Sequence, residues 1–150
     1  MRKMRLLFKK TGRAAFISHL DTMRTLQRAI ARADVAAKHT EGFNPHAYIS
    51  IALPLSLGYT SDCEMMNFVA EDAMTGDTIT ARLNAVLPEG LIAVRTYETE
   101  RKVKEICAAR FVITLDYDDG VPEGCGGALK QFYTNSPVYV MKKSKRGEKQ

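Results

Sequence analysis

The chain has few cysteines, and they form no recognisable pattern. Its 150 residues include only Cys63, Cys107 and Cys125, with neither a CxxC pair nor the Cys-His spacing of a zinc site. Reduced thiols are the simplest account. No stretch approaches the roughly 20 apolar residues of a membrane-spanning helix, and the charged first eight residues lack the apolar core of a secretory signal. We therefore expect a cytoplasmic protein with no membrane partner.

The sequence also lacks the common catalytic motifs. It contains no convincing Ser-His-Asp order, no glycine loop of the phosphate-binding type and no carboxylate pair at catalytic spacing. The residues therefore predict a fold and a candidate site, but they indicate no reaction. We expect no cofactor and predict no metal site.

Basic residues exceed acidic ones, and they are unevenly placed. The 22 lysines and arginines outnumber 17 acidic residues, which gives a net charge of +5. Residues 1–13 contain no acid, and a second basic cluster begins at Lys142. Clustered basic charge attracts phosphate backbones or acidic proteins. Solvated strand ends and a frayed terminus are the simpler interpretation, since a modest net charge discriminates poorly.

Hydrophobic periodicity predicts an α+β domain over residues 1–98. Ser18 reads as the N-cap of a helix that runs to about Asp34, with Leu20, Met23, Leu26 and Ile30 facing a core. A second helix follows Thr75, with an inner face of Ile79, Leu83 and Val86. Period-two alternation predicts four strands, around Met4–Phe8, Ile49–Leu53, Met66–Ala70 and Leu91–Tyr97. This β-α-β-β-α-β order is typical of the ferredoxin-like split βαβ fold, a four-stranded antiparallel sheet with two helices on one face.

The rest of the chain resembles the start of a second such unit. Residues 99–106 are charged and read as a linker, and residues 107–150 as a partial ferredoxin-like unit with a basic tail. The pattern predicts a strand over Phe111–Tyr117, a glycine-weakened helix over Pro122–Tyr133 and a strand over Val138–Met141.

The richest polar segment lies at the start of the first helix and carries Ser18, His19 and Asp21. The free N–H groups and partial positive charge of a helix N-terminus suit an anion such as a phosphate. His19 is therefore a ligand-binding candidate, although a structural histidine bonded to a carbonyl is the simpler interpretation. Asp21 either caps the helix or pairs with Arg24 or Arg28.

A second polar segment carries Glu41, Asn44 and His46 in a glycine-proline turn. We predict that His46 points back to the helix start and faces His19 across a shared cleft. These histidines with Asp21 and Glu41 would suit several divalent ions, but the ligand spacing matches no recognised metal site. The apolar turn at residues 53–58 either covers the core or forms one wall of a pocket.

Arginines form a possible nucleic-acid contact. Arg24, Arg28 and Arg32 recur at four-residue spacing opposite the apolar face of the first helix, and Arg13 precedes them. Such a stripe can contact phosphates. A solvated helix face explains the same pattern.

Four motifs resemble those of one bacterial family of unknown function. They are FISHLD at 16–21, EGFNPH at 41–46, LPLSLG at 53–58 and LPEGL at 87–91. In this order they are similar to the DUF2344 family, whose members are called radical-SAM-linked proteins and occur alone or fused behind a cobalamin-binding radical SAM enzyme. The resemblance covers roughly residues 3–147. It implies an accessory domain to a radical SAM enzyme.

The chain departs from the family pattern in two places. Ala47 stands where a second proline is common, and relatives continue beyond residues 142–147, so the chain is expected to be truncated. It also has no CxxxCxxC motif, so its cysteines do not form the radical SAM cluster.

Three functions follow as hypotheses. The first is a non-catalytic accessory module that binds RNA or a nucleotide-bearing substrate for a radical SAM enzyme, although the stacking aromatics of an RRM signature are absent. The second is a small enzyme or metal-binding domain that uses His19 and His46. The third is a protein-docking domain with no small ligand.

Overall fold

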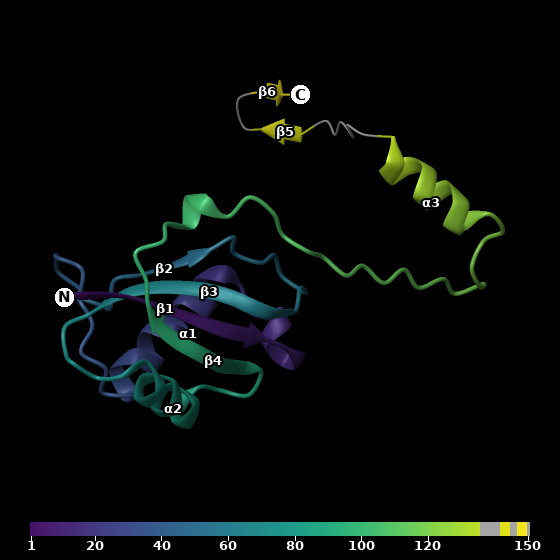
Figure 1. The fold of residues 1–150 in the computed structure, drawn as a ribbon. Helices are drawn as coiled ribbons and strands as arrows, with labels where there is room; N and C mark the ends of the chain where they lie inside the picture. The colour runs from purple at the N-terminus through teal and green to yellow at the C-terminus, as the bar shows by residue number, and fades with distance from the viewer. Residues whose placement is uncertain (136–141, 145–146, 150) are drawn as a thin grey trace. The chain divides into compact units, whose positions relative to one another are not determined.

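The computed structural model describes residues 1–135, 142–144 and 147–149 (Figure 1). The chain divides into two compact units, Met1–Cys107 (unit 1) and Ala108–Gln150 (unit 2). No helix of the described residues is long and apolar enough to cross a membrane.

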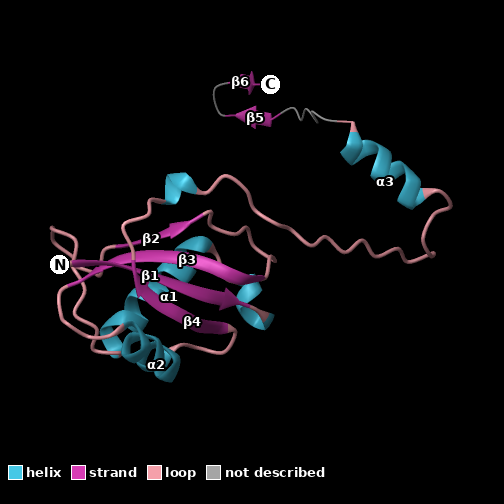
Figure 2. Ribbon diagram, in the orientation of Figure 1, coloured by secondary structure: helices cyan, strands magenta, loops and turns pink. Residues whose placement is uncertain are grey.

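Unit 1 is built around a four-stranded antiparallel sheet. Its strands are β1 (Arg2–Lys10), β2 (Ile49–Ala52), β3 (Ser61–Ala70) and β4 (Leu91–Glu98), in the spatial order β2-β3-β1-β4 (Figures 1 and 2). Each neighbouring pair is antiparallel. Helix α1 (His19–Arg32) connects β1 to β2, and helix α2 (Gly76–Val86) connects β3 to β4. The antiparallel four-stranded sheet predicted from the alternation is confirmed.

The core lies between one face of this sheet and the two helices. Alternate residues of a strand share a face, and Met4, Leu6 and Phe8 of β1 are at most 2% exposed. A single cluster joins them to apolar residues of the other elements, among them Leu26 and Ile30 of α1, Ile79 and Leu83 of α2, Met66 and Phe68 of β3, and Leu91 of β4. Both helices therefore pack on the same face of the sheet.

The predicted start of α1 is confirmed, and one of its predicted core residues is wrong. The Ser18 hydroxyl accepts a hydrogen bond from the Asp21 N–H at 3.1 Å and donates one to the Asp21 carboxylate at 2.7 Å. The helix ends at Arg32, and Asp34 adopts a left-handed backbone with φ of 52°. Leu20 is 64% exposed, not buried. It precedes Leu26 by six residues, which places it about 120° around the helix, away from the core.

Residues 99–106 lie against the outer side of β1. The Arg5 guanidinium donates to Asn67 Oδ1 and to the Arg101 carbonyl, both at 2.8 Å, and is buried by these contacts. The Thr99 N–H donates to the Lys3 carbonyl at 2.9 Å. The short 3-10 helix η2 (Val103–Glu105) follows. This charged segment is thus part of unit 1 and is bonded to its central strand.

Unit 2 contains helix α3 (Cys125–Thr134) and an antiparallel pair formed by β5 (Lys142–Ser144) and β6 (Gly147–Lys149). The helix predicted near Pro122–Tyr133 is confirmed. The strand predicted over Phe111–Tyr117 is wrong, because residues 106–117 carry neither helix nor strand and most of their apolar side chains are exposed. Alternation gives a strand only where a neighbour completes the backbone hydrogen bonds. The strand predicted over Val138–Met141 lies outside the described residues.

Candidate functional site

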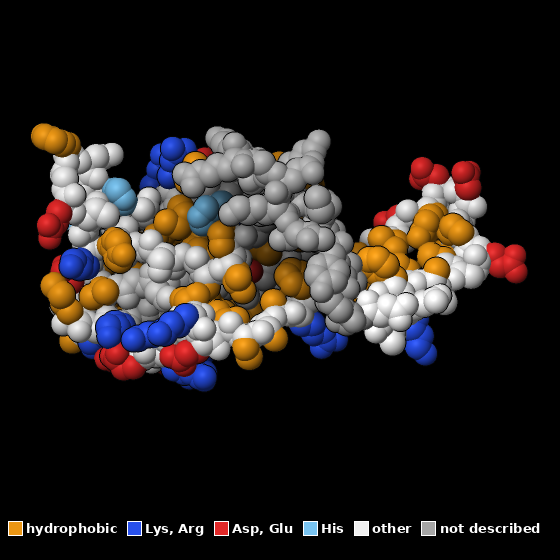
Figure 3. All heavy atoms as spheres, turned by 90° about the horizontal axis from the view of Figure 1, so that it is seen from above, with side chains coloured by type: hydrophobic (Ala, Val, Ile, Leu, Met, Phe, Trp, Pro, Cys, Tyr) orange, Lys and Arg blue, Asp and Glu red, His pale blue; other side chains and the backbone are white. Residues whose placement is uncertain are grey.

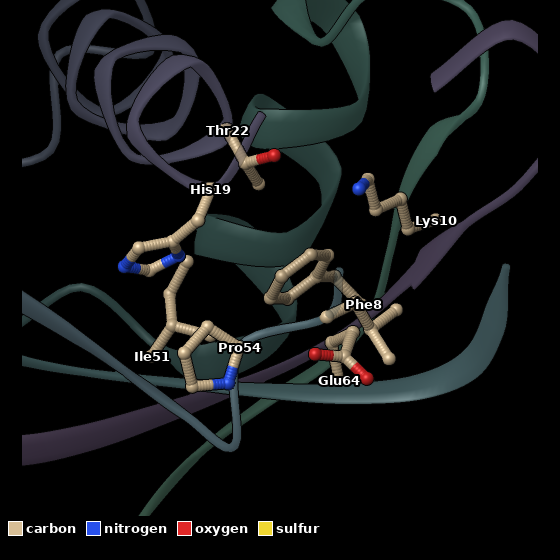
Figure 4. Close-up of a pocket in the computed structure, with 8 residues that line it drawn as sticks. Phe8, Lys10, His19, Thr22, Ile51, Pro54 and Glu64 are labelled. Carbon is tan, nitrogen blue, oxygen red and sulfur yellow. The ribbon is translucent and has the colours of Figure 1, made fainter. Parts of the chain in front are cut away.

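A small hollow lies between the first turn of α1 and the inner face of the sheet (Figure 4). The space that it leaves for a water-sized group is about 10 Å³, which is room for about one water molecule. The hollow combines apolar walls with three titratable side chains. It is lined by Phe8, Lys10, His19, Thr22, Ile51, Pro54, Leu55 and Glu64.

A buried lysine forms one side of this hollow. The alternation that turns Phe8 inward carries on to Lys10, which is only 2% exposed. The Lys10 Nζ donates to the Ile17 carbonyl at 3.1 Å. Among the described residues this is the one hydrogen bond of that ammonium, which has three N–H donors. Lys10 therefore retains donors that a bound group can use.

A buried glutamate forms the opposite side. Glu64 shares the inner face of β3 with Met66 and is 8% exposed. Burial raises the pKa of its carboxyl above the ordinary value of 4.5, and the Ser61 hydroxyl and the Lys10 charge offset part of that rise. No ion pair within 4.0 Å joins Lys10 to Glu64 in the part of the chain that the structure describes. Both residues line the hollow, with Lys10 nearer the start of α1 and Glu64 on the sheet, and they form no direct ion pair (Figure 4).

The raised pKa makes a prediction about stability and pH. Because folded Glu64 binds a proton more readily than unfolded Glu64, its contribution becomes less favourable as pH rises from about 4.5 through the folded pKa. Glu64→Gln removes this dependence. We compare the free energy of unfolding of the variant with that of the native chain by urea unfolding at about pH 4 and at about pH 7. The difference should favour the variant more at about pH 7 than at about pH 4. If the difference in free energy of unfolding is the same at both pH values, the raised pKa of Glu64 is wrong. Glu89→Gln, at an exposed position, is the control.

Of the three candidates at the helix start, only His19 lines the hollow. Asp21 is occupied by capping, because the hydrogen bond from Ser18 lowers the pKa of its carboxyl, with a further contribution from the charges of Arg24 and Arg28. Its carboxylate also lies 3.4 Å from the Arg24 guanidinium. Asp21 therefore both caps the helix with Ser18 and pairs with Arg24, the two roles that the sequence offered as alternatives for Asp21.

The second candidate segment forms a loop that is closed on itself. The Thr40 N–H donates to the His46 carbonyl at 2.9 Å, and the His46 N–H donates to Thr40 Oγ1 at 3.3 Å. The His46 Nδ1 lies 2.9 Å from the Asn44 carbonyl oxygen, so an N–H at that position donates within the loop. Glu41, Asn44 and His46 are all exposed. These contacts describe a histidine that shapes its own turn.

The described contacts do not bring the two segments together. The Gln27 side chain donates to the Ala47 carbonyl at 3.3 Å, and Gln27 lies eight residues, or about 12 Å, along α1 from His19. No residue of 41–46 lines the hollow. The shared cleft of His19 and His46 stays a prediction. Within residues 1–135, 142–144 and 147–149, no three His, Cys, Asp or Glu side chains are placed to hold a metal ion.

The apolar turn after β2 forms one wall of the hollow through Pro54 and Leu55. The Gly58 N–H donates to the Ala15 carbonyl at 2.8 Å and so holds the turn to the 3-10 helix η1 (Gly12–Phe16). Four large apolar side chains of η1, α1 and this turn are exposed: Phe16, Leu20, Leu53 and Leu57. Hydrophobic side chains are also spread between charged ones on the face shown in Figure 3.

The three arginines of α1 form an exposed stripe. Arg24, Arg28 and Arg32 (the arginine stripe) are all exposed and recur every four residues, which is about 6 Å along the helix. Arg24 pairs with Asp21, whereas no ion pair of Arg28 or Arg32 occurs among the described residues. Arg13 is exposed on η1. The predicted position of the stripe, opposite the apolar face of the helix, is confirmed.

Lys10 and Glu64 were missed in the sequence. Both continue the inward alternation of their strands, Lys10 after Phe8 and Glu64 before Met66. Carrying the period-two pattern one step further in each strand would have predicted both as inward-facing charges.

Comparison with known families gives one match. The model of a family described as uncharacterized proteins conserved in bacteria, DUF2344, matches residues 3–150. Because the match spans nearly the whole sequence, the chain belongs to this family, as its four motifs indicated. No curated protein matches the chain.

Proposed function

We propose that this member of the DUF2344 family is a binding module, that it acts with a radical SAM enzyme, and that it holds RNA or a nucleotide-bearing substrate. The observation that carries the binding role is the exposed arginine stripe, of which only Arg24 has an ion-pair partner among the described residues. The resemblance of the four motifs to radical-SAM-linked proteins supports the partner.

We also propose that residues 1–98 have the ferredoxin-like split βαβ fold. The element order β1-α1-β2-β3-α2-β4 and the strand order β2-β3-β1-β4 support this assignment. Some RNA-binding domains of similar architecture bind through the open sheet face with stacked aromatics. Here α1 carries the basic surface, so we place the polyanion on the helix rather than on the sheet.

The stripe suits a phosphate backbone for an electrostatic reason. Guanidinium groups bind phosphate oxygens in a fork geometry and stay charged at every physiological pH. Three of them span about 12 Å of α1. Binding to single strands releases counterions, so the slope of log affinity against log salt is about −0.7 per phosphate neutralised.

Replacing the three arginines of the stripe by alanine is expected to weaken binding of a single-stranded oligoribonucleotide. The slope of log affinity against log salt should become less negative by about 2, from three lost contacts at about 0.7 each. Fluorescence anisotropy at several salt concentrations measures both quantities. Folding should change little, because these side chains are exposed.

A matched control distinguishes the loss of the arginine stripe from the loss of three positive charges anywhere on unit 1. Lys3, Arg95 and Lys104 are also exposed and lie on other elements of unit 1, so their triple alanine variant removes the same charge elsewhere. Affinity and slope should change much less in this control. If the stripe variant binds as tightly as the native chain, the nucleic-acid role of α1 is wrong.

A further inference from the structure

We infer that the hollow beneath the first turn of α1 binds a ribose 2′-hydroxyl and so lets the protein distinguish RNA from DNA. This inference rests on the proposed RNA binding, and it names the ribose 2′-hydroxyl as the group that the ligand must have. Two charged side chains more than nine-tenths buried, Lys10 and Glu64, face this one space, and no ion pair between them occurs in the described chain.

A hydroxyl is the group that these two side chains complement. Its O–H can donate to the Glu64 carboxylate while its oxygen accepts from the Lys10 ammonium. Both charged groups would then be hydrogen-bonded to the same hydroxyl, in addition to the bond that Lys10 already donates to the Ile17 carbonyl. A phosphate would be repelled by Glu64, and an ammonium by Lys10. The paired charges therefore select a neutral group that both donates and accepts.

The size of the hollow supports the same group. About 10 Å³ is room for one water-sized group, and a hydroxyl places a single oxygen there. A carboxamide or the edge of a nucleobase presents several polar atoms in a row and is too large. His19 and Pro54 stand at the sides of the space, so the body of the ligand stays outside (Figure 4).

The surroundings of the hollow suit a sugar of a nucleic-acid strand. Arg13 on η1 and Arg24 on α1 flank His19 in sequence and are both exposed. Arg24 lies five residues, about 7.5 Å along the axis, beyond His19. A nucleic-acid strand that wraps around the start of α1 can therefore place a phosphate near Arg24 and one ribose over the hollow. The 2′-hydroxyl is the group that distinguishes RNA from DNA at such a site.

The test compares three single-stranded probes of one sequence and length, namely RNA, DNA and 2′-O-methyl RNA, by fluorescence anisotropy at one salt concentration. We expect RNA to bind about tenfold more tightly than DNA, the usual effect of leaving a buried polar group without its partner. The 2′-O-methyl probe should bind no better than DNA. Its methyl group removes the donor and exceeds the space, although its sugar keeps the RNA shape.

A charge-neutral double variant assigns this preference to the hollow. Lys10→Met with Glu64→Met removes both polar groups without changing the net charge, so the general attraction to phosphates is unchanged. In this variant, RNA should bind no more tightly than DNA, as the 2′-O-methyl probe is expected to do with the native protein. The exposed pair Lys104→Met with Glu89→Met is the control and should keep the native ratio. Thermal unfolding checks that both variants fold.

The outcomes separate this inference from the proposed function. Equal affinity for RNA and DNA, with a normal effect of the stripe variant, overturns the hydroxyl site and leaves the binding module intact. Tight binding of the 2′-O-methyl probe also overturns it, since strand shape would then explain the preference. This probe tests the native protein, so the inference remains falsifiable if the double variant does not fold. No binding of any probe overturns both proposals.

Discussion

Phe8→Ala is expected to lower the free energy of unfolding of unit 1 by about 3–5 kcal/mol. Phe8 is 1% exposed, on the central strand β1, between the helices and the sheet. Truncation removes buried apolar surface and leaves a cavity that neighbours such as Leu6 and Met66 fill only in part. Because a domain of this size is stable by only about 5–15 kcal/mol, a large part of its stability would be lost. Urea unfolding followed by circular dichroism measures the change.

The sequence provides a matched control for this substitution. Phe16 lies eight residues later and is 73% exposed. Phe16→Ala makes the same chemical change where there is little packing to lose, so we expect a change within about 0.5 kcal/mol. Similar losses for both variants would show that Phe8 is not packed as the structure describes.

Gly76→Ala is the second substitution with a large expected effect. Gly76 is the first residue of α2, where the helix passes directly over β4. A β-carbon at this position would overlap the carbonyl oxygen of Thr96, a backbone atom that no rotamer change can move. We expect a loss of roughly 3 kcal/mol in the free energy of unfolding, since α2 and β4 must separate to relieve the overlap.

Gly126→Ala is the corresponding control. Gly126 is the second residue of α3, and nothing lies within 4 Å of the added β-carbon. Alanine there should leave the unfolding of unit 1 unchanged and stabilise α3 by up to about 1 kcal/mol, because glycine is the weaker helix former. Thermal unfolding of both variants, measured together, shows the contrast. A neutral Gly76→Ala would mean that α2 lies farther from β4 than described.

The Thr80 and Asn84 side chains explain why α2 must approach β4 so closely. The Asn84 amide donates to the Ala93 carbonyl and accepts from the Ala93 N–H, each at 2.8 Å. The Thr80 hydroxyl donates to Thr96 Oγ1 at 2.9 Å. These contacts satisfy polar groups of an edge strand that would otherwise be open to pairing with another chain. Gly76 is the residue that allows the approach.

Some elements were predictable because their signals are local. Ser18 and Asp21 cap α1 within one turn of helix. The alternation of β1 and β3 also marks which side chains are buried, since each strand has a neighbour on both sides. The same pattern failed at Phe111–Tyr117. No neighbouring strand pairs with those residues in the described chain, so the alternation there had no structural consequence.

The candidate site was less predictable, because it depends on residues far apart in the chain. His19 was singled out as a polar residue at a helix start, and the structure places it beside a hollow. Lys10 and Glu64 were not, because each is a single charge at the end of an inward alternation. The 53 residues between them give no sign that both line one hollow. His46 was singled out for the same site. Its polar neighbours bond within its own loop, and its approach to His19 stays a prediction.

The sequence by itself determined the family, the helix starts, the four strands of unit 1 and the exposed arginine stripe. Each depends on residues within a few positions of one another, where propensity, capping and periodicity act. Only the tertiary structure decided that Leu20 is exposed, that Gly76 lies over β4, and that Lys10, Glu64 and His19 line one hollow. These features arise when segments distant in the chain pack against each other, and their contacts depend on the sheet order rather than on any local pattern.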